Sequence, residues 1–218
     1  MINEVIGIYG ASGFGKEVLP LVVQQFPSGD IYFIDDNITS NELNGIRVLT
    51  LDLFNQLPSS SKKVVIAIAD KNIRRSLTHK IKTLNLECVT IFSQNSFVLG
   101  NVNLGEGSIV CPFVTLTSDI EIGLSFQANL YSYVAHDCII GDFVTFAPAV
   151  KCNGNVIIED GAYIGTGAII KQGTPSRPLV IGKDSVVGMG SVVTKSVKAG
   201  DTVFGAPAKS IYNKRTLK

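Results

Sequence analysis

The chain has 218 residues, of which 45% are hydrophobic and 17% charged, and its formal net charge is +1 at pH 7. This composition is ordinary for one large or two modest folded domains and excludes a disordered chain. The small net charge supplies no long-range field that would attract nucleic acid or an anionic membrane. No apolar run approaches the ~20 residues of a membrane span, and the first residues do not resemble a secretion signal, so we expect a cytoplasmic protein.

The first predicted element is a short strand over Ile6–Tyr9, followed by the glycine-rich run GASGFGK at 10–16 and an amphipathic helix over Glu17–Phe26. A glycine turn between strand and helix brings backbone N–H groups at the helix N-terminus close to a bound anion. The spacing is not the full dinucleotide fingerprint, and glycine turns also form for steric reasons. A phosphate-binding role and a purely structural role are therefore both open.

Two further predicted strands, Ile31–Ile34 and Val64–Ala69, are each followed directly by polar residues. The first ends in Asp35 and Asp36, which either bind a ribose or base or simply begin a turn. The second is followed by Asp70, Lys71 and Asn72. Because ligands collect outside the carboxyl ends of strands in open α/β sheets, these loops predict a binding crevice.

A helix over Ile73–Leu84 is expected next, with His79 as a solvated surface residue. Cys88–Phe92 is the predicted closing strand, and Ser93–Ser96 the hinge to a second domain. These boundaries give domains over residues 1–95 and 96–218. The first is too short for a complete dinucleotide-binding fold, which favours a mononucleotide-sized ligand.

From Val98 onward an apolar or small residue returns at every sixth position. The register is Val98, Leu104, Val110, Leu116, Ile122, Ala128, Val134, Ile140, Phe146, Cys152, Ile158, Ile164 and Ile170. This period is typical of a parallel β-helix in which three hexads form one triangular coil with these side chains inside. The register breaks over Lys171–Val180, where two prolines and a glycine predict a loop, and resumes at Ile181, Val187 and Val193.

His136 is the candidate catalytic residue of this repeat region. Its inward neighbour Val134 predicts that the histidine points outward, and Asp137 can hold one tautomer of the imidazole and raise its basicity. A plain surface histidine is the alternative. A zinc-dependent hydratase is excluded, because it needs several histidine ligands and the repeat region has one.

Two further groups are interpreted as structural. Four cysteines (Cys88, Cys111, Cys138, Cys152) lack CxxC spacing and are expected to be reduced core residues without a metal. The basic residues of the end segment (Lys214, Arg215, Lys218) are expected to be a solubilising tail.

Six segments together resemble the nucleotide-sugar acetyltransferase family that includes the bacillosamine-pathway N-acetyltransferase and the sialic acid O-acetyltransferase. They are GASGFGK at 10–16, FIDD at 33–36, IAIADKNIR at 66–74, AHDCIIGDF at 135–143, KCNGNVIIEDGAYIGTGAII at 151–170 and VFGAPAK at 203–209. The resemblance implies a small Rossmann-like domain, a left-handed parallel β-helix, and a homotrimer that binds acetyl-CoA between adjacent β-helices. The hand comes from the resemblance alone, since crossovers between parallel strands are right-handed by default.

The resemblance also implies roles for individual residues. Ser12, Gly13 and Phe14 would line the nucleotide-sugar phosphates, Asp35 and Asp36 the uridine, and Asp70, Lys71 and Asn72 the rest of that pocket. His136 would be the general base and Asp137 its carboxylate partner, where the family often has glutamate. Thr145, Thr166 and Gly188 would meet acetyl-CoA. Separately from the resemblance, we expect the oxyanion donor to be a backbone N–H of the turn Asn153-Gly154-Asn155, with Gly154 among the cofactor-binding residues. Thr145 and Phe14 stand where the family can have histidine.

The expected reaction is acetyl transfer from acetyl-CoA to the 4-amino group of a nucleotide-linked 4-amino-4,6-dideoxy sugar, with UDP as the expected nucleotide and dTDP as an alternative. No metal is required. The alternative with the same fold but a different acceptor is O-acetylation of a sugar such as sialic acid. A non-catalytic sugar-nucleotide-binding scaffold is the third hypothesis.

Overall fold

The computed structural model describes residues 4–212, so the basic residues expected to form a tail lie outside the described residues. The chain forms two compact units. The first comprises the chain up to Gln94 together with Glu106–Ile109, and the second comprises Asn95–Gly105 and the chain from Val110 onward. No helix among the described residues is long and apolar enough to cross a membrane.

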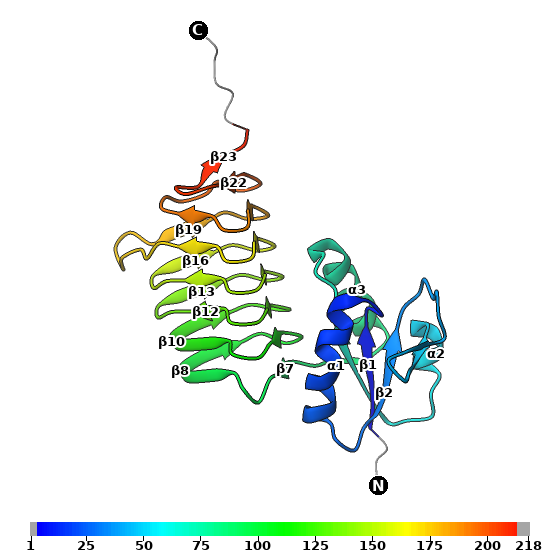
Figure 1. The fold of residues 1–218 in the computed structure, drawn as a ribbon. Coiled ribbons are helices and arrows are strands. Elements are labelled where there is room, and N and C mark those ends of the chain that lie inside the picture. Colours follow the sequence, from blue (N-terminus) through cyan, green and yellow to red (C-terminus); the bar gives the residue numbers. More distant parts are fainter. Residues whose placement is uncertain (1–3, 213–218) are drawn as a thin grey trace. The chain divides into compact units, whose positions relative to one another are not determined.

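The first unit is built on a six-stranded sheet with the order β3-β4-β2-β1-β5-β6 (Figure 1). All neighbouring strands are parallel except β3 and β4. The strands are β1 (Glu4–Tyr9), β2 (Asp30–Ile34), β3 (Glu42–Leu43), β4 (Ile46–Leu49), β5 (Ser61–Ile66) and β6 (Glu87–Cys88). The helices are α1 (Gly13–Gln25), α2 (Leu51–Asn55) and α3 (Lys71–Thr83).

Several boundaries in this unit differ from the prediction. Helix α1 begins at Gly13 rather than Glu17, so the glycine run forms its first turn. Strand β5 ends at Ile66, three residues before the predicted end at Ala69. The predicted strand over Cys88–Phe92 is wrong: it is divided by Val89 and Thr90, and β7 (Ile91–Phe92) is not part of the α/β sheet. The elements β3, β4 and α2 are too short for a periodic pattern and were not predicted.

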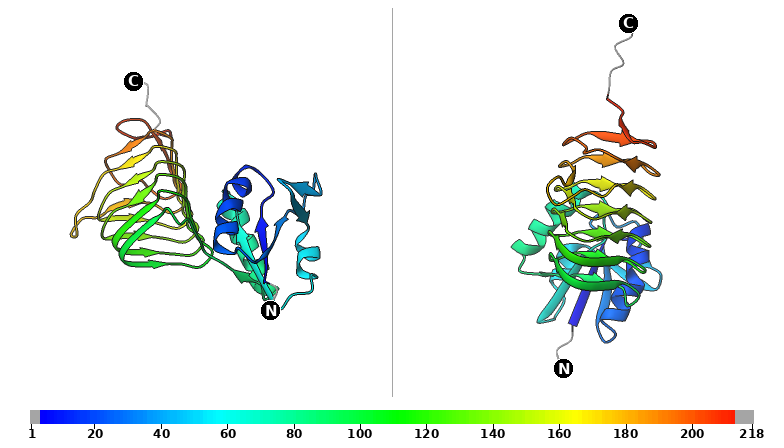
Figure 2. Two further views of the ribbon diagram at one scale, coloured as in Figure 1. Left: turned by 60° about the horizontal axis from the view of Figure 1, so that its bottom comes forward. Right: turned by 90° about the vertical axis from the view of Figure 1, so that its left-hand side faces the viewer.

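The second unit is a parallel β-helix whose coils are triangular turns with three faces (Figure 2). Strands β8 (Phe97–Leu104) and β10 (Thr115–Ile122) each run through the second and third faces. The first face contains β9 (Ile109–Val110), β11 (Gln127–Ala128), β14 (Thr145–Phe146), β17 (Tyr163–Ile164), β20 (Val186–Val187) and β22 (Thr202–Phe204). The second contains β12 (Tyr133–Val134), β15 (Lys151–Cys152), β18 (Ile169–Ile170) and β21 (Val192–Val193). The third contains β13 (Cys138–Ile140), β16 (Val156–Ile158) and β19 (Leu179–Ile181).

The predicted register fills the inside of this prism. From Val110 to Ile170 every register position is buried, and so are Ile181, Val187 and Val193. Val98 and Leu104 are exceptions and correct the prediction: Val98 is 45% exposed and Leu104 is only partly buried, because both belong to the first coil and no earlier coil of the prism covers them. The four cysteines are buried and free, as expected.

The predicted loop is also shorter than expected. Strand β19 already begins at Leu179, so the loop covers residues 171–178. A regular coil pairs residues 18 positions apart, as Cys152 and Ile170 do. Ile170 instead pairs with Val193, which is 23 positions on, so this coil is five residues longer, and the loop accounts for the extra length. The stack ends in β22 and β23 (Lys209–Ser210), which pair antiparallel.

Candidate active site

The glycine turn lies at the carboxyl end of β1, where three loops meet at one edge of the sheet. Tyr9 pairs with Ile34 of β2 and Ile66 of β5, so the loops after these strands are neighbours. Backbone hydrogen bonds continue the contact beyond the strands: the Gly10 N–H donates to Ile34 O and the Ala67 N–H donates to Tyr9 O, both at 2.8 Å. The structure therefore brings together the three polar loops that the sequence placed at this edge.

The glycines of this turn have different structural requirements. Gly10 has φ +116°, and a Cβ at Gly15 would lie 2.0 Å from the Gly10 carbonyl oxygen, so the fold requires glycine at both positions. Gly13 has an ordinary φ, and nothing lies within 4 Å of the place where its Cβ would be. The absence of a side chain at Gly13 leaves open space at the start of α1.

Ser12 precedes this helix as its N-cap residue, but its side chain makes no capping hydrogen bond. The first N–H groups of a helix have no partner within the helix, and they carry the positive end of the helix dipole. Ser12 and Gly13 are exposed and Phe14 is partly buried. This helix end can therefore bind an anionic group such as a phosphate.

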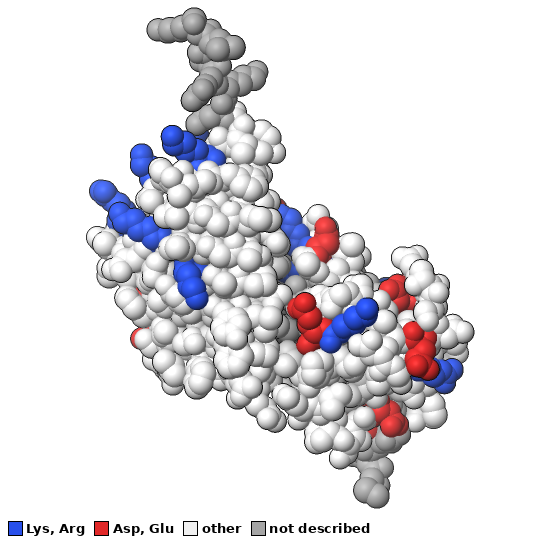
Figure 3. All heavy atoms as spheres, in the orientation of Figure 1, with Lys and Arg blue, Asp and Glu red and all other residues white. Residues whose placement is uncertain are grey.

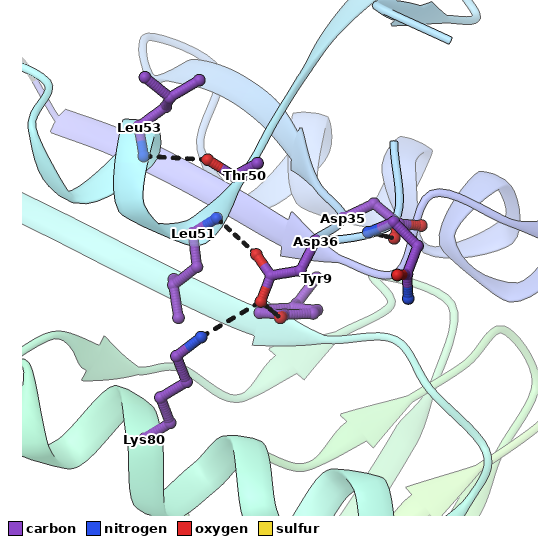
Figure 4. Close-up of polar contacts among 8 residues, drawn as sticks. Tyr9, Asp35, Asp36, Thr50, Leu51, Leu53 and Lys80 are labelled. Carbon is purple, nitrogen blue, oxygen red and sulfur yellow. Dashed lines mark hydrogen bonds and ion pairs between the residues drawn. The ribbon is translucent and has the colours of Figure 1, made fainter. Parts of the chain in front are cut away.

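Asp36 is the centre of a hydrogen-bond network that the sequence did not predict (Figure 4). Its carboxylate accepts hydrogen bonds from Tyr9 Oη (2.7 Å) and the Leu51 N–H (2.9 Å), and it forms an ion pair with Lys80 Nζ at 3.2 Å. Partial burial opposes ionisation, but these three donors outweigh it and lower the pKa of Asp36. Asp36 thus connects β1, α2 and α3.

Asp35 is left with more freedom than Asp36. Its Oδ1 accepts a hydrogen bond from the Asn37 N–H at 2.9 Å, whereas its Oδ2 has no hydrogen-bond partner among the described residues. The side chain is partly buried at the sheet edge. Of the two aspartates, Asp35 is the one whose carboxylate is available to a ligand.

The loop after β5 is held by two residues with structural roles. Asp70 caps α3, because its Oδ1 accepts from the N–H groups of Asn72 and Ile73 at 2.9 Å. Arg74 is completely buried and donates to Ile68 O (3.1 Å) and Ala69 O (2.7 Å). Burial lowers the pKa of the Arg74 guanidinium to about 10, so it remains charged at neutral pH.

The sequence contained a signal for Arg74 that the prediction did not use. The buried residues of α3 are Arg74, Leu77, Thr78 and Ile81, a helical spacing that places the arginine in the apolar stripe. Lys71 is partly buried, and Asn72 and His79 are exposed. The expectation of a surface histidine at 79 is confirmed.

In the second unit, His136 and Asp137 lie at the corner between the second and third faces. His136 Nδ1 is 2.6 Å from Asp137 Oδ2, and both side chains are about half exposed, at 51% and 54%. A carboxylate at Nδ1 favours the tautomer that carries its proton there. Nε2 is then left with a lone pair that can accept a proton from a substrate.

Gly154 lies against the imidazole from the next coil. A Cβ at this position would be 2.6 Å from both Nε2 and Cε1 of His136, so the ring occupies space that only glycine leaves free. The Gly154 N–H donates no hydrogen bond to any described residue. An unpaired N–H beside the imidazole is suited to bind a developing oxyanion.

The turn that carries Gly154 is fixed from several sides. Asn155 N–H donates to His136 O at 3.0 Å. Asn153 Nδ2 donates to Ile170 O at 2.7 Å, and Asn153 Oδ1 accepts from Tyr133 Oη at 2.8 Å. These contacts hold Gly154 and His136 in a defined arrangement.

The other predicted acetyl-CoA residues do not lie beside His136. Thr145 is buried in β14 on the first face. Thr166 and Gly188 lie at the corner between the first and second faces, where the Phe204 ring covers Gly188 so closely that a Cβ would be 2.0 Å from its Cε1. Within one chain, the structure therefore brings only Gly154 of these residues to the histidine.

No group of three or more His, Cys, Asp or Glu side chains that could hold a metal ion occurs in residues 4–212.

Comparison with known proteins identifies relatives of this chain. Residues 5–81 match the family model of the PglD N-terminal domain. GDP-perosamine N-acetyltransferase of Escherichia coli O157:H7 is 47% identical over 98% of this chain and 99% of its own length.

Two solved structures share the whole fold. WeeI from Acinetobacter baumannii AYE is 55% identical with a TM-score of 0.94, over 96% of this chain and 100% of that one. The acetyltransferase domain of PglB from Neisseria gonorrhoeae FA1090, in complex with acetyl coenzyme A, is 28% identical with a TM-score of 0.87 and the same coverage. The predicted fold class, a small α/β domain followed by a parallel β-helix of hexapeptide repeats, is confirmed. The chain belongs to the PglD/PerB-type family of nucleotide-sugar N-acetyltransferases, enzymes that use acetyl-CoA.

Proposed function

We propose that this enzyme transfers the acetyl group of acetyl-CoA to the 4-amino group of a nucleoside-diphosphate-linked 4-amino-4,6-dideoxy sugar in bacterial glycan biosynthesis. The observation that carries the proposal is the imidazole of His136, which rests on Gly154 and is held at Nδ1 by Asp137. Family membership favours N-acetylation over the O-acetyltransferase and scaffold hypotheses.

In the proposed mechanism the thioester is already activated, so the enzyme mainly aligns the substrates and moves one proton. The sugar amine attacks the thioester carbonyl carbon, and Nε2 of His136 takes the proton that the nitrogen loses. The oxygen of the tetrahedral intermediate accepts a hydrogen bond from the Gly154 N–H. The carbon–sulfur bond then breaks, and the departing CoA thiolate regains a proton from the imidazolium, which Asp137 stabilises.

The first unit is proposed to bind the nucleotide. Ser12, Gly13 and Phe14 at the start of α1 would hold the diphosphate, with Lys71 and Asn72 contributing to the pocket. Asp35 would accept from the base, while Asp36 and Asp70 hold their loops in place. This division follows from the partners that the two latter carboxylates already have.

GDP and UDP are the main candidates for the nucleotide, and dTDP is the alternative given above. GDP is favoured by the relative that is named for GDP-perosamine and aligns over the whole chain. UDP is implied by the resemblance in the sequence motifs. Guanine presents two N–H donors to a carboxylate and uracil one, so both bases suit Asp35.

The acetyl-CoA residues support a shared site between copies. Gly154 lies with His136 at one corner of the prism, whereas Thr166 and Gly188 lie at another corner, with the second face between them. We infer that acetyl-CoA binds in a groove to which neighbouring copies of a homotrimer each contribute one corner. Thr145, inside the first face, would act by shaping the wall of that groove.

A thiol-release assay across GDP-, UDP- and dTDP-linked 4-amino sugars tests the proposal. One of these should release CoA thiol and the matched 4-hydroxy sugar should not. His136→Ala should lower kcat/KM for that substrate by at least ~10²-fold at saturating acetyl-CoA, which is typical of general-base catalysis. No thiol release with any amino sugar, or an active His136→Ala enzyme, would contradict the proposal.

A further inference from the structure

The inside of the β-helix contains two thiols that the proposed mechanism does not use. Lys and Arg side chains gather on the outer surface over the C-terminal coils on the face seen in Figure 3, whereas Cys138 and Cys152 point into the prism and are 1% and 0% exposed. Cys138 begins β13 on the third face, and Cys152 ends β15 on the second face one coil further on. Both cysteines therefore lie on the inner side of the corner that carries His136 and Gly154.

Cys138 contacts the backbone of both turns at this corner. Its Sγ lies 3.3 Å from Asn153 O and 3.6 Å from His136 O. His136 O already accepts from the Asn155 N–H at 3.0 Å, whereas Asn153 O accepts from no backbone N–H among the described residues. The thiol proton of Cys138 therefore goes to Asn153 O, which is the closer acceptor and the one that still needs a donor.

The second thiol supports this hydrogen bond. Cys152 hydrogen-bonds to Cys138, which lowers the pKa of Cys138 and, together with complete burial, raises the pKa of Cys152. Cys152 therefore stays a neutral thiol whose S–H points at Cys138 Sγ, while Cys138 gives its own proton to the Asn153 carbonyl. Hydrogen bonds in such a chain polarise one another, and the dry interior of the prism strengthens them.

The neighbouring coils show that packing alone does not require sulfur at these positions. The peptide after each second-face strand has the same two inward neighbours in every coil. One coil earlier they are Ile120 and Val134, and one coil later they are Val156 and Ile170. Aliphatic side chains satisfy the hexad register but cannot donate a hydrogen bond. Of these three coils, the one with thiol donors is therefore the one in which the peptide leads to Gly154.

The direction of the Asn153 carbonyl fixes the direction of the Gly154 N–H. The two groups belong to one planar peptide, and because this peptide is trans they point in opposite directions. A carbonyl oxygen held on the inner side of the corner by Cys138 therefore turns the Gly154 N–H to the outer side. The imidazole of His136 lies against Gly154 there.

We propose that Cys138 is a positioning residue for acetyl transfer, whose thiol holds the Asn153–Gly154 peptide with its carbonyl inward and its N–H directed at the oxyanion of the tetrahedral intermediate. The proposal rests on the proposed function, in which the Gly154 N–H is the oxyanion donor. Cys138 touches neither substrate and acts through the peptide alone. Without the thiol, the Asn153 carbonyl has no fixed donor, and the N–H on the other side of the peptide is no longer aligned.

The first test measures the single-turnover rate of acetyl transfer at saturating acetyl-CoA, with the GDP-, UDP- or dTDP-linked 4-amino sugar that wild type acetylates fastest. Cys138→Val and Cys138→Ala lack the donor and should each react at least ~10-fold more slowly, since complete removal of an oxyanion donor typically costs ~10²–10³-fold. Cys138→Ser keeps a donor and should stay within about 3-fold of wild type. KM for both substrates should change less than about 2-fold, because the interaction is made only in the transition state.

Two controls separate this role from a structural one. Cys111→Ala removes another buried thiol of the β-helix and should react like wild type. Cys138→Val carries the side chain that Val156 places at the same position of the next coil, so its Tm should stay close to that of wild type. A wild-type rate in Cys138→Val and Cys138→Ala, an equally slow Cys138→Ser, or a rate loss that follows Tm rather than the presence of a donor would overturn the proposal.

A second test needs no sugar acceptor and so separates this proposal from the proposed function. The sequence contains two Asn–Gly peptides, Asn44–Gly45 and Asn153–Gly154, so protein labelled with ¹³C-carbonyl asparagine and ¹⁵N-glycine gives two carbonyl–amide NMR signals. The Asn153 carbonyl carbon should move upfield in Cys138→Val, which lacks the donor, and remain near its wild-type position in Cys138→Ser. The Asn44 signal should not move and serves as the internal control. An unmoved Asn153 signal in Cys138→Val would overturn the proposal even if acetyl transfer is intact.

Discussion

Gly13 and Gly15 lie two positions apart in the first turn of α1, yet the structure gives them different reasons to be glycine. A Cβ at Gly15 meets the Gly10 carbonyl oxygen at 2.0 Å, whereas a Cβ at Gly13 meets nothing within 4 Å. Packing within the fold therefore requires glycine at position 15. It does not require glycine at position 13, where we expect the bound ligand to need the space. The two positions therefore allow binding and folding to be tested separately.

Gly13→Ala should leave the free energy of unfolding within about 0.5 kcal/mol of wild type, because exposed substitutions in open space cost little. It should weaken nucleotide binding, measured as a smaller rise in Tm with GDP or UDP. Gly15→Ala is the matched control, and it should destabilise the free protein because the backbone must move. A Gly13→Ala protein with an unchanged nucleotide response would contradict a phosphate site at this helix end.

The lowered pKa of Asp36 predicts how stability depends on pH. Its folded-state pKa lies below the unfolded value of ~3.9, so ionised Asp36 stabilises the protein above that pH and the contribution is lost as pH falls further. Asp36→Asn should be less stable than wild type at neutral pH, and the difference should narrow below about pH 4. Urea denaturation of both proteins across this range is the measurement. If the difference in the free energy of unfolding between the two proteins did not change with pH, the ionised Asp36 network could not be its cause.

At the scale of elements, the hexad register was the most predictable part of the molecule. Each inward position is supported by many equivalent ones, so Val110 to Ile170 could be placed from spacing alone. The Tyr9–Asp36–Lys80 network could not, because its side chains are 27 and 44 residues apart and meet only after the sheet forms. The start of α1 was missed because glycines resemble a turn more than a helix.

Truncating an inward side chain should destabilise the β-helix more in an inner coil than in the first coil. Ile164 is fully buried, so Ile164→Ala should lower the free energy of unfolding by about 2–5 kcal/mol. Val98 also occupies a hexad register position, on the second face of the first coil, but is 45% exposed, so Val98→Ala should cost less than about 1 kcal/mol. Chemical denaturation gives both values. Equal costs would show that the first coil is covered in solution.

At the scale of the whole molecule, the placement of His136 and Thr166 at different corners predicts that active sites are assembled from two copies. His136→Ala and Thr166→Arg should each be inactive alone. After mixing, denaturation and refolding, random assembly should pair an intact His136 corner with an intact Thr166 corner in about a quarter of sites. Activity near one quarter of wild type supports the shared site.

The same mixture also has a result that would contradict the shared site. If each chain holds a complete site, the mixed sample stays inactive, because every site carries one of the two substitutions. Refolded wild type is the control for recovery. Light scattering should give a mass close to three times the 23.3 kDa of one chain.

The antiparallel pairing of β22 and β23 has a consequence for solubility. A stack of parallel coils ends in a row of open backbone groups onto which another chain could polymerise, as strands do in fibrils. Because β23 pairs antiparallel with β22, it occupies the hydrogen-bonding groups at the end of the first face with a strand of the wrong direction for a further coil. On this face the final hairpin thus protects the end of the stack against the addition of another chain.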